Sequence, residues 1–235
     1  MGWTTVKTKQ NIEVMRLFFK LSNLEDDRIV RTIHETSKTK QRSWHSRVLV
    51  LLRKSELNFL INLNITTKQK LRMAQDKLTA IDQEKWLIDV FDDKNSVNGN
   101  KLRTFRRFKN NCKTSLFVKT INFRDHRRIL SNFRCGSLPL AVETGRYTKP
   151  TTPLCDRLCL FCNNNFIETE QHFLIDCNFY SDIREELFNY INALNNTFNA
   201  FNSDEKFDFI MNCDHAQVLL AKTLHLMFKR RKINL

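Results

Sequence analysis

The stretch CLFCNNNFIETEQHFLIDC, residues 159–177, places three cysteines and a histidine close together in the chain, with the spacing Cys159-x2-Cys162-x9-His172-x4-Cys177. A Cys-x2-Cys turn can aim two thiolates at one ion, and a compact loop can return a histidine and a third cysteine to complete a tetrahedron. We therefore expect Cys159, Cys162, His172 and Cys177 to bind one Zn²⁺.

Four protein ligands fill the coordination shell and leave no position for water or substrate, so the predicted zinc is structural. Cys177 follows His172 by five positions, which is about 140° around a straight helix. The chain is therefore expected to break between them. Ordinary buried cysteines beside a histidine are the alternative interpretation, and Cys155, or Cys213 with His215, are weaker candidates as substitute ligands.

The predicted zinc segment is acidic, because residues 155–190 hold seven Asp and Glu against Arg157 and Arg184. A knuckle that grips phosphates normally carries basic and stacking residues. The metal is therefore expected mainly to brace the fold, and the phenylalanines nearby are expected to belong to the core.

The rest of the chain is basic, with 39 Lys and Arg against 25 Asp and Glu and a net charge of +14. Residues 1–150 hold 31 basic and 14 acidic side chains (net +17), and residues 151–235 hold 8 and 11 (net −3). Residues 94–134 hold 12 basic side chains against one acidic side chain, Asp125. This distribution favours a polyanionic partner, RNA and/or DNA.

Two similar segments, LRTFRRFKNNCK from Leu102 and FRDHRRILSNFR from Phe123, each carry the pattern R-x-x-R-R. As helices, each would place an apolar stripe on one face and a basic sector on another, and guanidinium groups suit bidentate phosphate contacts. Solvated surface helices are the alternative interpretation. The predicted nucleic-acid-binding residues are Arg103, Arg106, Arg107, Lys113, Arg124, Arg127, Arg128 and Arg134.

Apolar residues recur at helical spacing along most of the chain, and Gly (4) and Pro (3) are scarce, so the predicted fold is mainly α. All three prolines lie in residues 136–153, where the charge also changes sign. We therefore predict a basic helical part (1–135), a Pro/Gly connector (136–153), and a small zinc-knuckle module with flanking helices (154–235). The longest apolar run has five residues, 48–52, too short to span a membrane, so no membrane partner is expected.

Two further patterns bear on the compartment. Seven cysteines, an odd number without a signal peptide, favour a reducing compartment. The run KRRK at Lys229–Lys232 fits a nuclear import signal, or basic charges that complement the C-terminal end of a helix dipole. The nucleus is the predicted location, with the cytoplasm as the alternative.

An ordered set of motifs surrounds the knuckle. LPLAVETGRY (residues 138–147) precedes Arg-x-Cys-x2-Cys (157–162), and these are followed by Glu168, the triplet HFL (172–174), Cys177, Tyr180 and Arg184. This order resembles the zinc-binding region near the C-terminus of reverse transcriptases from LINE-type non-LTR retrotransposons. Upstream, Gly2 and Trp3, the segment around Trp44, and KLRTF (101–105) resemble the thumb region of such polymerases.

The resemblance implies the same four zinc ligands and a role in holding template RNA or target DNA during target-primed reverse transcription, with the polymerase domains of the element as further partners. The Y/F-x-D-D turn of the family's palm has no match here, because LEDD (24–27) and VFDD (90–93) lack the aromatic residue at the required position. No endonuclease motif is evident either. We therefore predict a non-catalytic nucleic-acid-binding fragment, with a zinc-stabilised protein-interaction module or a degenerate element remnant as the alternative.

Overall fold

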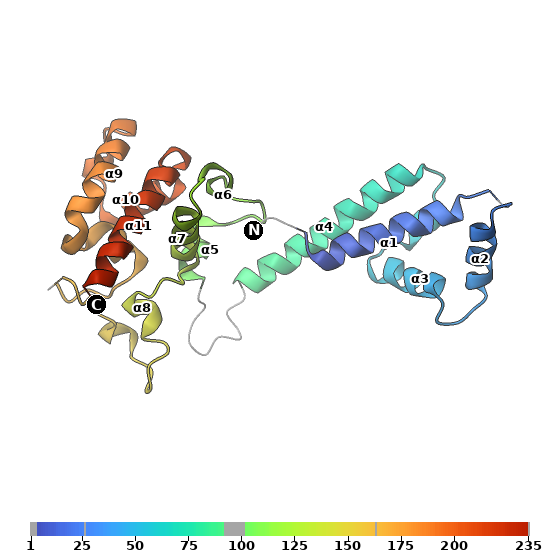
Figure 1. The fold of residues 1–235 in the computed structure, drawn as a ribbon, viewed down its shortest axis with the longest axis horizontal. Helices are drawn as coiled ribbons and strands as arrows, with labels where there is room; N and C mark the ends of the chain where they lie inside the picture. Colours follow the sequence, from blue (N-terminus) through green and yellow to red (C-terminus); the bar gives the residue numbers. More distant parts are fainter. Residues whose placement is uncertain (1–3, 26, 92–101, 163, 235) are drawn as a thin grey trace. The chain divides into compact units, whose positions relative to one another are not determined.

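The computed structural model describes residues 4–25, 27–91, 102–162 and 164–234. Most of these residues are helical, and the described ranges contain no strand beyond one antiparallel bridge between Leu158 and Ile167. The mainly α prediction is confirmed. The chain divides into two compact units, Gly2–Asp89 and Val90–Leu235 (Figure 1), here called the N-terminal and C-terminal units.

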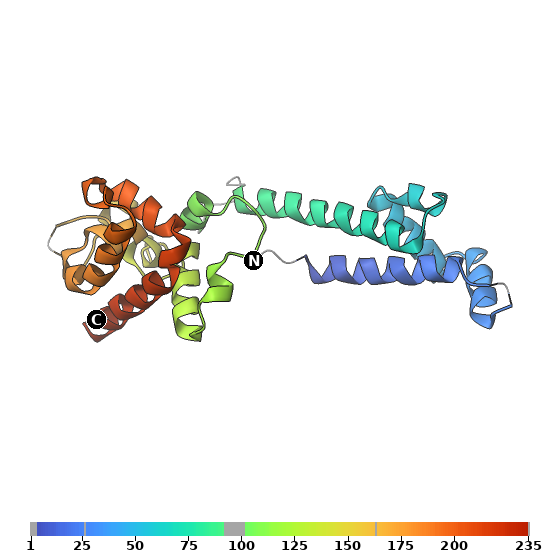
Figure 2. The same cartoon turned by 90° about the horizontal axis from the view of Figure 1, so that it is seen from above.

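The N-terminal unit is built on two long antiparallel helices. Its elements are α1 (Val6–Ser22), α2 (Ile29–Lys38), α3 (Trp44–Lys54), η1 (Asn58–Ile61) and α4 (Thr67–Phe91). Thr5 caps α1 by accepting a hydrogen bond from the Thr8 amide, and its own amide donates to Asp82 of α4 at 2.8 Å. At the other end, Asn23 donates to Thr67 at 3.0 Å, so α1 and α4 run side by side in opposite directions (Figure 2).

The core of this unit is formed by apolar side chains that recur at helical spacing on α1, α3 and α4, together with two leucines in and next to η1. The buried side chains are Ile12, Met15, Phe18, Phe19, Val48, Leu52, Leu57, Leu60, Ala74 and Leu78. Helix α2 differs, because Ile29, Val30 and Ile33 are exposed and its buried residue is His34. His34 packs its ring against Phe18, 5.8 Å between centroids.

The C-terminal unit is a cluster of helices around α11. Its helices are α5 (Arg103–Phe108), α6 (Phe117–Thr120), α7 (Arg124–Cys135), α8 (Ala141–Thr144), α9 (Ser181–Leu194), α10 (Ser203–Asn212) and α11 (Gln217–Ile233), with short turns η2 (Leu154–Asp156), η3 (His172–Asp176), η4 (Asn178–Tyr180), η5 (Phe198–Ala200) and η6 (Asp214–Ala216). Helices α7, α9 and α10 all pack against α11. Helix α10 begins with a capping box formed by Asn202 and Glu205.

The segment predicted as a Pro/Gly connector belongs to the core of the C-terminal unit. Leu138, Leu140 and Val142 are buried in the same hydrophobic cluster as Phe173 and Leu224. The observed division of the chain therefore lies between residues 89 and 90 and differs from the predicted boundary at 136–153. Glycine and proline mark turns inside a domain as well as linkers: Gly136, at φ 66°, ends α7 in the left-handed conformation and turns the chain back.

Candidate metal centre

The structure brings the four predicted ligands together. The sulfur atoms of Cys159, Cys162 and Cys177 and a ring nitrogen of His172 all lie within 4.8 Å of one another. Cys162 Sγ is 3.3 Å from His172 Nε2, and Cys159 Sγ is 3.8 Å from Cys177 Sγ. Cys159, His172 and Cys177 are buried, and Cys162 is half-buried. Three sulfurs and one imidazole at this spacing form a cluster that could hold a metal ion.

A short hairpin positions the first two cysteines. The bridge between Leu158 and Ile167 pairs its two arms, and the Cys159 amide donates to the Phe166 carbonyl at 2.9 Å. Asn165 takes a left-handed conformation, φ 51°, which asparagine tolerates in turns. The pairing fixes where Cys159 leaves the hairpin, and Cys162 follows it around the tip.

The second two ligands come from η3, a π-helical turn at His172–Asp176. The Cys177 amide donates to the His172 carbonyl at 2.8 Å, five residues back. An i→i+5 bond closes a wider turn than an α-helix does, so His172 and Cys177 face the same side. The predicted break between these two residues is therefore replaced by a widened turn, after which Cys177 becomes extended.

Backbone N–H groups donate to all three sulfurs of this centre, and each of these bonds lowers the pKa of its cysteine. Each cysteine receives the backbone N–H of the residue two positions later, from Phe161, Asn164 and Phe179 respectively. The Cys159 and Cys177 sulfurs also share a hydrogen bond, and this bond is the largest cause that lowers the pKa of Cys159 to about 3. The same bond raises the pKa of Cys177, and burial raises the pKa of Cys162. A metal cation would displace the proton that Cys159 and Cys177 share.

A buried ion pair supports the hairpin from behind. Glu168 and Arg231 are both buried, and the Arg231 guanidinium donates to both oxygens of the Glu168 carboxylate. That carboxylate also accepts the Ala141 amide at 2.6 Å and lies 3.9 Å from Cys159 Sγ. Burial raises the pKa of Glu168. Helix α11 is thereby linked to the arm of the hairpin next to Cys159, a candidate metal ligand.

Two other arginines attach the centre to the surrounding chain. Arg157 donates to the carbonyls of Val142 and Thr152, both at 2.9 Å. A side chain at Gly145 would lie 2.7 Å from Arg157 Cγ, so this close approach requires glycine. Arg184 is buried and donates to the Cys177 carbonyl at 2.8 Å. These contacts give a structural role to several residues of the ordered motif set.

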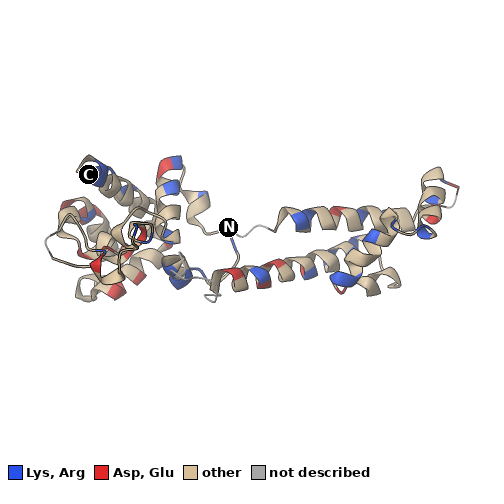
Figure 3. Ribbon diagram, turned by 90° about the horizontal axis from the view of Figure 1, so that it is seen from below, with Lys and Arg blue, Asp and Glu red and all other residues tan. Residues whose placement is uncertain are grey.

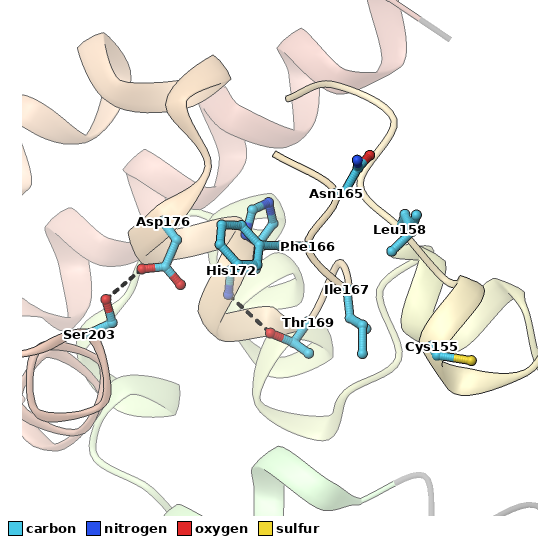
Figure 4. Close-up of a pocket in the computed structure, with 9 residues that line it drawn as sticks. All are labelled: Cys155, Leu158, Asn165, Phe166, Ile167, Thr169, His172, Asp176 and Ser203. Carbon is cyan, nitrogen blue, oxygen red and sulfur yellow. Dashed lines mark hydrogen bonds between the residues drawn. The ribbon is translucent and has the colours of Figure 1, made fainter. Parts of the chain in front are cut away.

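A concavity of about 700 Å³ lies against one side of the cluster. Figure 4 shows the residues that line it: Cys155, Leu158, Asn165, Phe166, Ile167, Thr169, His172, Asp176 and Ser203. The polar contacts drawn there are internal, since Ser203 donates to Asp176 at 2.6 Å and the His172 amide donates to Thr169 at 3.1 Å. Aliphatic and aromatic side chains form much of the wall, as in a surface that contacts another apolar group.

The substitute ligands weighed from the sequence lie outside the cluster. Cys155 is exposed on η2, Cys213 is half-buried and His215 is exposed. A metal ion could be held by a group of three or more His, Cys, Asp or Glu side chains. In the part of the chain that the structure describes, the four predicted ligands are the one group of this kind.

Three of the predicted nucleic-acid-binding arginines have partners inside the C-terminal unit. Arg103 forms ion pairs with Glu170 and with Glu143, and Arg107 pairs with Asp208 at 2.6 Å. Arg134 donates to Gln217 at 2.8 Å and to the Met211 carbonyl, and burial lowers its pKa to about 10. The guanidinium groups of these arginines are engaged in contacts that stabilise the fold. Phosphates would need the same guanidinium groups.

The other five residues of that set divide into two kinds. Arg106 donates to the Val90 carbonyl at 2.6 Å, and Arg127 donates to the Ile121 carbonyl at 3.0 Å. Lys113, Arg124 and Arg128 are exposed.

The two segments that carry the R-x-x-R-R pattern form helices of different length: α7 covers residues 124–135, but α5 ends at residue 108. The sequence echo is therefore not a structural repeat. Figure 3 shows both basic and acidic positions on the ribbon of each unit.

Two of the four side chains in the basic run at residues 229–232 form ion pairs within the C-terminal unit. Arg230 forms a bidentate pair with Asp182, both contacts at 2.6 Å, and Arg231 is the buried partner of Glu168. Lys229 and Lys232 are exposed. The sequence analysis did not predict that Arg231 is buried. The available signal was its position on the same helical stripe as the apolar residues Leu224 and Met227.

No family model, curated protein or solved structure matches the chain. Within the described ranges, no helix combines the length and the apolar character needed to cross a membrane. Gly2, Trp3, Lys101 and the aspartates Asp26, Asp92 and Asp93 lie outside the described residues, so the thumb resemblance at those positions and the geometry of the two Asp-Asp pairs stay predictions.

Proposed function

We propose that the chain binds nucleic acid without catalysing a reaction, and that one Zn²⁺ braces its C-terminal unit. The observation that carries the zinc assignment is the buried cluster of Cys159, Cys162, His172 and Cys177, all within 4.8 Å. Three thiolates and an imidazole are a ligand set that suits tetrahedral zinc. The ion would join the hairpin to η3, and with four protein ligands it would have no vacant position for a substrate.

Metal analysis tests the zinc assignment. We expect the purified protein to contain about one zinc per chain and the Cys162→Ser variant to lose most of it, because a serine hydroxyl is a poor replacement for a thiolate. The matched control is Cys155→Ser, which changes an exposed cysteine of the same concavity outside the cluster. Equal zinc content in the wild type and the Cys162→Ser variant would contradict the assignment.

The nucleic-acid assignment rests on the charge of the chain and on the cations that the fold leaves exposed. The net charge is +14, and Lys119, Arg124 and Arg128 are exposed on α6 and α7. These three residues are called the α6–α7 cations below. Arg128 has an exposed partner, Asp125, at 3.3 Å, and exposed pairs of this kind are weak enough for a phosphate to replace the carboxylate.

Charge reversal tests this assignment. The variant Lys119→Glu/Arg124→Glu/Arg128→Glu is expected to bind RNA and DNA more weakly across sequences, with a salt slope shallower by roughly 2–3, because each lost phosphate contact removes about 0.7–0.9. The control is Lys40→Glu/Arg53→Glu/Lys54→Glu, which changes the net charge equally at exposed positions of the N-terminal unit. An equal loss in both variants would overturn the location, and no binding by the wild type at low salt would overturn the function.

The resemblance to the C-terminal region of LINE-type reverse transcriptases extends this proposal. In that setting the chain would hold template RNA or target DNA for polymerase domains of the same element, in the nucleus. Support comes from the residues of the ordered motif set that lie around the metal centre, including Gly145 beneath Arg157 and Glu168 beside Arg231. A labelled full-length chain that stays in the cytoplasm would contradict the nuclear part.

A protein-interaction module is the second candidate, favoured by one observation. The concavity beside His172 is largely apolar, and Leu160 and Phe166 near it are 78% and 57% exposed in an acidic part of the sequence. A zinc-loaded protein that binds neither RNA nor DNA at low salt would favour this candidate.

A further inference from the structure

Three rings form a ladder on the surface of the C-terminal unit. The Phe123 ring lies 5.4 Å from that of His126, and His126 lies 5.0 Å from His225, measured between centroids. Phe123 precedes α7, His126 lies in its first turn and His225 lies on α11. The two histidines are half-buried, whereas Phe123 is 72% exposed. The outer ring of the ladder therefore presents its surface to solvent.

The histidines hold the ladder in place. Helices α7 and α11 pack together, so His126 and His225 are carried by two elements fixed to each other. Burial is the largest cause that lowers the pKa of His126, and His225 and Lys222 lower it further. A neutral imidazole can pack against Phe123 without adding a desolvated charge.

Cations surround the ladder on both helices. Arg124 follows Phe123 directly, and Lys119 precedes it on α6. On α11, Lys229 lies one turn beyond His225 and is exposed, and Lys222 lies one turn before it. The acidic groups nearby are Asp125 and Glu186, and each is paired, with Arg128 and Lys222 respectively. The exposed aromatic ring therefore lies in a cationic environment.

We propose that Phe123 is a stacking platform for one base of a single-stranded nucleic acid whose phosphates lie on the α6–α7 cations, an inference that rests on the proposed nucleic-acid function. Every base has a π-face that can stack on an aromatic ring, and the backbone follows the neighbouring positive charges. In a duplex both faces of an internal base are covered by its neighbours. The platform therefore selects single strands over duplexes.

The test compares Phe123→Ala with the wild type in the zinc-loaded full chain. The probes are a fluorescently labelled 20-nucleotide oligo(U), oligo(dT) of the same length and a 20-base-pair duplex, each titrated over a salt series. We expect Phe123→Ala to weaken single-strand binding by roughly 5- to 100-fold with an unchanged salt slope and unchanged duplex affinity. Phe123→Trp should retain single-strand binding, because indole offers a larger stacking surface. Phe59→Ala is the matched control, since Phe59 is 48% exposed in the N-terminal unit.

The outcomes separate this inference from the proposed function. Single-strand affinity unchanged by Phe123→Ala, while the wild type still binds with a steep salt slope, would overturn the platform and leave nucleic-acid binding in place. An equal loss for single strands and duplex would also overturn it, since stacking would then not discriminate. No binding of any probe by the wild type would overturn both.

Discussion

Chelation of the proposed zinc is expected to unfold the C-terminal unit and to leave the N-terminal unit folded. Structural zinc sites contribute about 10–16 kcal/mol in small peptides at pH 7, and the stability of a typical domain is only about 5–15 kcal/mol. In this unit the ligands are part of the core, because Cys159, His172 and Cys177 are buried among the same side chains that hold η3 and α9. Loss of the metal would leave thiols and an imidazole buried without their partner.

The distribution of tryptophan makes this result simple to read. All three tryptophans, Trp3, Trp44 and Trp86, belong to the N-terminal part of the sequence, and Trp44 packs against Phe18 in the core there. We expect a zinc chelator to remove a large part of the helical circular dichroism signal while tryptophan emission stays unchanged. Addition of excess Zn²⁺ should restore the signal.

Two other results would contradict that expectation. Full retention of helix after the metal has been removed would show that the core of the C-terminal unit is sufficient without it. A simultaneous change in tryptophan emission would show that the two units do not unfold separately, against the division at residues 89 and 90. The Cys162→Ser variant should behave as the chelated protein does, and Cys155→Ser should behave as the wild type.

The sequence was sufficient for features that depend on short-range patterns. Apolar spacing predicted a mainly helical chain, because a helix that covers a core must repeat its apolar side chains every three or four residues. The cluster of candidate ligands was predictable for a similar reason, because only certain spacings of cysteine and histidine in the sequence allow the side chains to bind one ion. The π-helical form of η3 was not predictable, because nothing in the local sequence pattern indicates that the Cys177 amide donates to the His172 carbonyl five residues back.

Partners of charged side chains were harder to predict because they come from distant parts of the chain. The basic residues around Arg103 in the sequence suggest that it binds phosphate, but its side chain is paired with Glu170, 67 residues away. The same holds for Arg134, which lies against Gln217, 83 residues away. Local composition fixes the charge of a segment, and only the tertiary fold decides which of its cations remain exposed.

Replacement of Arg231 is expected to destabilise the C-terminal unit strongly. Arg231→Met removes a guanidinium that donates to Glu168, donates to the Pro139 carbonyl at 3.2 Å and lies 4.7 Å from the Phe161 ring centroid. Glu168 is fully buried, and a buried charge left without its partner costs about 3–5 kcal/mol. For a unit of this size the melting temperature should fall by roughly 10 °C, measured by circular dichroism on the zinc-loaded protein.

The adjacent residue supplies the control. Arg230→Met makes the same substitution one position earlier, where the guanidinium and its partner Asp182 are 33% and 63% exposed. Exposed ion pairs are screened by water, so this variant should melt close to the wild type. Equal losses from both substitutions would mean that the methionine itself, or the helix end, is responsible and that burial of the pair is not.

A double substitution separates two contributions to the free energy of unfolding: the cost of a buried charge without a partner and the net stabilisation that the ion pair provides. In Glu168→Gln/Arg231→Met neither charge remains, and buried pairs replaced by uncharged groups are often close to neutral. The double variant should therefore recover much of the stability that Arg231→Met loses, which gives a large coupling in the double-mutant cycle. If Glu168→Gln instead adds its own loss to that of Arg231→Met, the two side chains contribute independently. Recovery would mean that Arg231 is required because Glu168 is buried and charged, which ties the C-terminal end of α11 to the arm of the hairpin beside Cys159.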